Sequence, residues 1–159
     1  MYEGVKHSYA LLVLVLMEII EELGTDRGIE MLQTAIEKQA DIIHDKHIIE
    51  IPEGSTPLEI GDAVYRSFME GVNAEVSVHD RREDSITYLV KRCPFYEAFL
   101  NVGIDCGYFL GGLCTHITLP AIKAILSRFD GTLAVETRLV RESAEEFCLE
   151  EVFLESPKA

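Results

Sequence analysis

Residues 56–92 read TPLEIGDAVYRSFMEGVNAEVSVHDRREDSITYLVKR, and within them the spacing of apolar residues changes from helical to alternating. The opening Thr-Pro-Leu-Glu is a capping box with proline at the first helical position, so a helix is expected from there to about Gly71. Residues 74–79 and 85–92 then alternate in polarity around a charged turn, which is typical of a β-hairpin. The change from helices to strands is therefore expected near the middle of the chain.

The remaining periodicity extends this pattern in both directions. Helices are expected over residues 6–23, 25–47, 94–103 and 107–129, the last restarting at Pro120. A second hairpin is expected from residues 132–140 and 146–155. The resulting order, ααα-ββ-αα-ββ, predicts an α+β fold in which N-terminal helices pack on an antiparallel four-stranded sheet.

The bulk composition describes an acidic globular protein. A chain of 159 residues suits a single domain, residues 1–159, with a helical half (1–72) and a ββ-αα-ββ half (73–156). The formal net charge of −14 repels phosphate backbones and anionic lipids, so neither a nucleic acid nor a membrane is expected as a partner. Without a readable export signal, a cytoplasmic location is expected.

The first two expected helices differ in their apolar pattern. Residues 6–23 are apolar on nearly every side, which predicts a helix that is buried or shared with a second subunit, and hence a homodimer. The run from Tyr9 to Met17 is too short to span a bilayer, which needs roughly 20 residues. The second helix is expected to turn a stripe to the core through the apolar residues Ile29, Leu32, Ala35, Ile42 and Ile43.

Cysteine is the residue type here with the widest chemical range, and the chain has four. Cys93 precedes Pro94 and is expected to cap a helix, where backbone N–H groups and the helix dipole lower a thiol pKa. The alternative is a small buried residue between strand and helix. Cys106 is expected to fill the core.

Several further residues could bind a metal or take part in catalysis. Cys114 and His116 would point the same way in extended backbone and could share a metal or form a thiol–imidazole pair, whereas in a helix they would point apart. Glu136 is a charge within an apolar strand, either solvent-exposed at an edge or a ligand or base in a central strand. Asp41, His44 and His47 follow one another at three-residue steps on the second helix, a spacing that can build a metal site.

Three of these segments together resemble a known family. Residues 93–97 (CPFYE), residues 113–114 (LC) and residues 135–138 (VETR), which lead to Cys148, are similar to the L-2-amino-thiazoline-4-carboxylate hydrolase-like family. The same layout resembles the related vinyl-reductase-type (4-vinyl reductase) small-molecule-binding domain, which also occurs in phenol-responsive sensors. The resemblance covers about residues 85–155 and implies the same α+β fold.

The two resemblances imply different functions. The first implies a hydrolase that opens a small cyclic C=N substrate, with Cys93 or Cys114 as nucleophile and His116 moving protons. The second implies a non-catalytic domain that binds a small ligand between sheet and helices, with or without a metal at Cys114, Glu136 and Cys148. No cofactor is required by the sequence, and zinc and iron are the candidate metals. The phenol sensors have a further ligating cysteine where this chain has Leu139.

Overall fold

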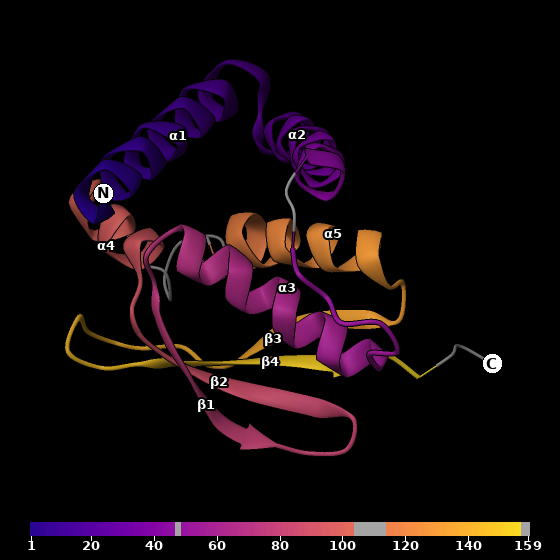
Figure 1. Cartoon of the computed structure of the whole chain (residues 1–159). Helices are drawn as coiled ribbons and strands as arrows, with labels where there is room; N and C mark the ends of the chain where they lie inside the picture. The colour runs from indigo at the N-terminus through magenta and orange to yellow at the C-terminus, as the bar shows by residue number, and fades with distance from the viewer. Residues whose placement is uncertain (47–48, 104–113, 157–159) are drawn as a thin grey trace.

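The computed structural model describes residues 1–46, 49–103 and 114–156 (Figure 1). Its helices are α1 (Tyr2–Leu23), α2 (Thr25–Lys46), α3 (Pro57–Gly71), α4 (Pro94–Asn101), the π-helical segment η1 (Cys114–Thr118) and α5 (Leu119–Phe129). Its strands are β1 (Glu75–Arg81), β2 (Ser85–Arg92), β3 (Leu133–Leu139) and β4 (Cys148–Leu154). The predicted α+β class and the order of helices and strands are confirmed.

Two hairpins form one antiparallel sheet. Its strand order is β1-β2-β4-β3, so β2 and β4 are central and the first hairpin joins the second through them. Tyr88 in β2 pairs with Glu150 in β4, and Glu150 pairs with Thr137 in β3. Because paired residues in adjacent strands point to the same face, this row belongs to the face that α3 and α5 cover in Figure 1.

Helix α3 forms as its sequence predicts and lies close to the sheet. The Thr56 hydroxyl accepts from the Glu59 N–H at 3.3 Å, and the Glu59 carboxylate accepts from the Thr56 N–H at 2.8 Å, which completes the capping box. A Cβ at Gly61 would lie 2.8 Å from a Leu133 methyl carbon and 3.1 Å from one of Val152. The glycine therefore allows α3 to approach β3 and β4 closely.

Helices α1 and α2 form an arm above this layer and meet at Gly24, whose φ of 87° suits glycine (Figure 1). Helix α1 packs on α4, and α2 packs on α5. On the α2–α5 side, Arg128 donates to Asp41 at 2.6 Å and also to Glu37. The arm is thus attached at both ends and spans the space between them.

The arm corrects two details of the predicted packing. Of the two alternatives predicted for α1, full burial is wrong, because only Val13 and Leu16 of this helix are buried in the described chain, whereas a surface shared with a second subunit stays a prediction. The buried stripe of α2 consists of Gly28, Leu32, Ile36 and Ala40, and Ile42 is exposed. The prediction of the stripe was wrong by about one residue because Ile and Ala occur on several sides of this helix.

Among residues 1–46, 49–103 and 114–156, no helix has the length and apolar character needed to cross a bilayer.

Candidate functional site

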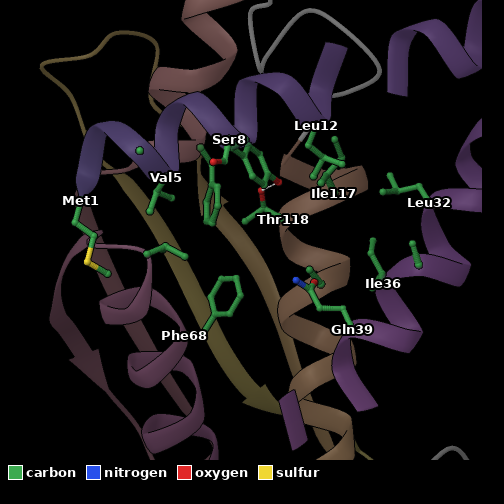
Figure 2. A pocket seen from close by; sticks show the side chains of 16 residues that line it. Met1, Val5, Ser8, Leu12, Leu32, Ile36, Gln39, Phe68, Ile117 and Thr118 are labelled. Carbon is green, nitrogen blue, oxygen red and sulfur yellow. Dashed lines mark hydrogen bonds between the residues drawn. The ribbon is translucent and has the colours of Figure 1, made fainter. Parts of the chain in front are cut away.

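A large pocket lies beneath the arm. It is a pocket of about 810 Å³ between α1 and α2 on one side and α3, α4, η1 and α5 on the other (Figure 2). Most of its wall is apolar, from the side chains of Val5, Leu12, Leu32, Ile36, Phe68, Phe95 and Ile117. Its size lies within the range of about 300–1,000 Å³ that small-molecule sites occupy.

Sequence spacing explains the two walls that the arm provides. Val5, Tyr9 and Leu12 follow each other at steps of four and three residues on α1, so they share one side of that helix. Leu32 and Ile36 do the same on α2. The two apolar sides face each other across the pocket, as Figure 2 shows for Leu12 and Leu32.

A few polar groups interrupt the apolar lining. The Tyr9 hydroxyl and the Thr118 hydroxyl lie 3.0 Å apart and share a hydrogen bond, which Figure 2 draws beside Ser8. Gln39 adds an amide from α2. No side chain that carries a formal charge lines the pocket in the described parts of the chain. Such a lining suits a neutral molecule with an apolar body and one or two hydrogen-bonding groups.

Aromatic rings fix the floor of the pocket. The Tyr9 ring lies 4.3 Å from that of Phe95 and 5.7 Å from that of Phe99, both on α4. Phe95 in turn lies 6.2 Å from Phe68 of α3. These centroid distances are those of packed aromatic pairs, so the floor joins α1, α3 and α4 into one unit.

Cys93 lies at its predicted position, but its thiol does not have the lowered pKa that was predicted. It is the N-cap residue of α4 with extended backbone, and it makes no side-chain capping hydrogen bond. Burial strongly raises the pKa of its thiol, and the nearby Cys114 adds to this effect. The backbone N–H groups of Tyr96 and Phe95 lower the pKa, as a helix start should, but less than burial raises it. The prediction of a lowered pKa was therefore wrong.

A raised thiol pKa gives a testable expectation for Cys93. Because the thiolate is the reacting form, Cys93 in the folded protein should react with iodoacetamide at pH 7.5 at least about tenfold more slowly than in urea-unfolded protein. Mass spectrometry of the peptide that carries Cys93, sampled over time, would measure both rates. Equal rates in the two states would contradict the burial of this thiol.

Cys114 and His116 both belong to η1, which decides between their two predicted arrangements. Two residues apart on a helical backbone, their side chains leave the helix in different directions. The predicted thiol–imidazole pair is therefore not formed. Cys114 instead contributes to the raised pKa of Cys93, because a negative charge on one thiol opposes ionisation of the other. Thr118, the last residue of η1, is the one whose hydroxyl lines the pocket.

The sheet register separates the residues predicted to hold a metal. Glu136 pairs with Glu151, whereas Cys148 lies two residues from Glu150 and so on the other face of β4. Glu136 is about 44% exposed and forms an ion pair with Arg138 at 2.8 Å. Within the described residues no group of three His, Cys, Asp or Glu side chains is placed to hold a metal ion. The structure thus does not bring Glu136 and Cys148 together as the predicted site at Cys114, Glu136 and Cys148 requires.

The four remaining predicted candidates have structural roles or lie outside the described residues. Asp41 accepts from Arg128 at 2.6 Å, and the His44 ring meets that of Phe129 edge-on at 4.9 Å, so both fasten α2 to α5. His47 and Cys106 lie outside the described residues.

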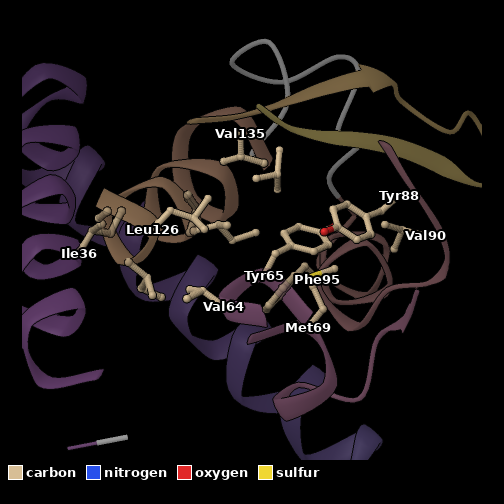
Figure 3. Close-up of a cluster of buried hydrophobic side chains, with 14 of the residues drawn as sticks. Ile36, Val64, Tyr65, Met69, Tyr88, Val90, Phe95, Leu126 and Val135 are labelled. Carbon is tan, nitrogen blue, oxygen red and sulfur yellow. The ribbon is translucent and has the colours of Figure 1, made fainter. Parts of the chain in front are cut away.

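A buried carboxyl group escaped the sequence analysis. Glu150 lies in the centre of β4, and the Tyr65 hydroxyl of α3 donates a hydrogen bond to it. Tyr65 stacks on Tyr88 at 4.2 Å (Figure 3). Tyr88 in turn donates a hydrogen bond to Asp62 at 2.5 Å. Burial raises the pKa of Glu150, and the hydrogen bond from Tyr65 only partly opposes this. The signal in the sequence was the alternation of Cys148, Glu150 and Val152 along one strand.

Arg141 was also missed, and it explains the surroundings of Cys148. Its guanidinium is buried and donates to the carbonyl oxygens of Val90 at 2.5 Å and Lys91 at 2.6 Å. Its Nε lies 3.3 Å from the Cys148 sulfur, and the guanidinium lies 5.1 Å from the Tyr96 ring centre. Cys148 thus contacts the guanidinium group that holds the end of β2.

A scan of protein-family models and a search of curated proteins give no match to this chain. The resemblance to the thiazoline-carboxylate hydrolase-like family and to the vinyl-reductase-type domain therefore stays a prediction from residues 85–155.

Proposed function

We propose that this protein binds a small, neutral, largely apolar molecule in the pocket beneath α1 and α2. The observation that carries the proposal is the lining: a pocket of about 810 Å³ whose described wall is apolar except for hydroxyl and amide groups. Apolar surface removed from water contributes roughly 25 cal/mol per Å², so such a wall favours apolar ligands. This corresponds to the ligand-binding alternative of the sequence analysis, with the pocket under the helical arm and not against the sheet.

The polar groups narrow the ligand class. The Tyr9–Thr118 pair and Ser8 offer hydroxyl donors and acceptors near α1, and Gln39 offers an amide on the α2 side. A ligand with one hydroxyl or carbonyl group could exchange hydrogen bonds with them. A carboxylate or ammonium group would lose its hydration without gaining an opposite charge from the described wall, which costs several kcal/mol. We therefore expect hydroxylated aromatic or alicyclic molecules to bind and their charged analogues to be rejected.

We do not propose cysteine-dependent ring opening. A nucleophilic thiol needs a lowered pKa or an adjacent base. Burial raises the pKa of Cys93, and the η1 backbone directs His116 away from Cys114. Neither thiol is among the residues that line the pocket.

Calorimetry with a matched ligand pair tests the proposal. 4-Hexylphenol is expected to bind with a micromolar dissociation constant, and 4-hexylbenzoate at least about tenfold more weakly, because its charge finds no partner. Burial of apolar surface should also give a negative heat-capacity change on binding. Equal affinity for the two compounds, or no binding of either, would refute the proposed ligand class.

A pocket-filling substitution locates the site. Ala121 lines the pocket on α5, so Ala121→Phe should weaken 4-hexylphenol binding at least about tenfold by occupying its space. Ala144 is exposed in the β3–β4 turn, and Ala144→Phe is the matched control with unchanged affinity expected. Circular dichroism of both variants would establish that they are folded. Undiminished binding by a folded Ala121→Phe protein would place the ligand elsewhere.

A further inference from the structure

The outer side of α1 exposes a row of large apolar side chains. Leu11 is 62% exposed, and Leu14 and Val15 are each 47% exposed. Together with His7 and Glu18 they recur at steps of three and four residues, which places them on one side of the helix. We call these five residues the outer stripe of α1. In Figure 1 α1 lies at the periphery of the molecule, with α4 and α2 on its inner side.

Charge is distributed unevenly along this helix. The exposed acids Glu18, Glu21 and Glu22 gather in its C-terminal third, where the helix dipole is also negative. His7 lies in the N-terminal third, where the dipole is positive, and its ring is 3.8 Å from Glu3. The centre of the stripe, from Leu11 to Val15, is uncharged.

We propose that the outer stripe binds a second copy of the same helix in antiparallel orientation. A parallel pair would set the three acids of one copy against those of the other, and like charges at close range are destabilising. An antiparallel pair instead sets each acidic end against the partner's helix start, where the dipole is positive and where Lys6 and His7 accompany the single carboxylate Glu3. The apolar centres coincide, with Leu11 of one copy beside Val15 of the other. The stripe is therefore self-complementary in both charge and hydrophobicity, as a two-fold interface requires.

The area that two α1 helices can bury against each other indicates how tightly the dimer should associate. Helix α1 has 22 residues and is about 33 Å long. One helix pair of that length buries less than the roughly 1,600 Å² of a standard stable interface. The dimer should consequently dissociate at low micromolar concentration. The inner side of α1 remains in place as a wall of the pocket, so this inference stands or falls independently of the proposed ligand.

Sedimentation equilibrium over a concentration series tests the interface. The wild-type mass should rise with concentration from 17.9 kDa toward twice that value. Leu11→Glu puts a charge into the apolar centre twice per dimer and should raise the dimer dissociation constant at least about 30-fold, as loss of a hot spot does. Leu139→Glu changes a leucine of 46% exposure at the end of β3 and serves as the matched control. Wild-type protein that stays monomeric at about 100 µM, or a dimer unaffected by Leu11→Glu, would overturn the proposal.

A charge exchange tests the orientation. His7→Glu should weaken the antiparallel dimer, because it faces Glu18 of the second copy with another carboxylate. Adding Glu18→Lys to that variant should restore the association by creating an opposite pair at the same place. In a parallel dimer the double variant would set glutamate against glutamate and lysine against lysine, so restored association supports the antiparallel arrangement. A double variant as weak as His7→Glu alone would exclude it, and thermal unfolding of each variant verifies that it is folded.

Discussion

Phe99→Ala is expected to lower the free energy of unfolding by about 3–5 kcal/mol, the loss found when a large buried aromatic side chain is truncated. Phe99 is fully buried in α4, and its ring lies 5.7 Å from that of Tyr9 in α1. Truncation removes apolar contacts and leaves a cavity at the junction that attaches the arm to the rest of the domain. Domains of this size unfold at a cost of about 5–15 kcal/mol, so the variant should be near the limit of stability.

Urea unfolding followed by circular dichroism would measure this change. Leu100 is the next residue of α4 and is 45% exposed, so Leu100→Ala is the matched control, with an expected change within about 0.5 kcal/mol. Because α1 provides one wall of the pocket, Phe99→Ala should also weaken ligand binding under conditions where the protein is still folded. A loss below about 1 kcal/mol would mean that α1 and α4 are held together by other contacts.

Local signals in the sequence predicted the helices and strands well. The capping box at Thr56, the prolines at positions 94 and 120, and the alternation after Gly71 each act through nearest neighbours in the chain. A proline at the first turn fixes φ where no N–H is needed, and this preference does not depend on tertiary contacts. The start of each of these helices could therefore be predicted.

The pocket could not be predicted because no local pattern encodes it. Its wall combines residues such as Tyr9, Leu32 and Phe95 from helices that are distant along the chain. Helix α1 is apolar on several sides, so its periodicity does not reveal that one side covers a pocket while another stays exposed. The alternation in β4 is equally uninformative about which face is buried, because each face of this strand carries a glutamate, at position 150 or 151. Only pairing with Tyr88 shows that Glu150 is the buried one.

A related reason explains why the structure separates residues that the sequence analysis grouped into one site. Resemblance placed Cys114, Glu136 and Cys148 in one site on the basis of motif order alone. In an antiparallel hairpin, a shift of one residue reverses the face to which a side chain points. Glu136 aligns with Glu151 and therefore lies on the face opposite Cys148. Likewise, a cap position predicts N–H groups near Cys93 but does not show how deeply the sulfur is buried.

The buried Glu150 should make the stability of the protein fall as the pH rises. Its pKa in the folded state is raised above the ordinary value of 4.5, chiefly by burial. Between these two values the folded chain holds a proton that the unfolded chain releases, so folding is favoured at low pH and loses stability as the pH increases. The contribution of this group is fully present below about 4.5 and is lost as the pH passes through the raised pKa, at up to about 1.4 kcal/mol per pH unit.

Comparison with Glu150→Gln isolates this effect from that of the other carboxyl groups. Glutamine keeps an acceptor for the Tyr65 hydroxyl but does not ionise, so the variant should gain stability relative to wild type as the pH rises from 4.5 and then reach a constant difference. Urea unfolding at a series of pH values gives that difference directly. Tyr65→Phe should extend the pH range over which stability is lost toward higher pH. The reason is that the hydrogen bond that lowers the pKa of Glu150 is absent in this variant. A difference between Glu150→Gln and wild type that is the same from pH 4 to pH 9 would mean that Glu150 is not buried as a titrating group.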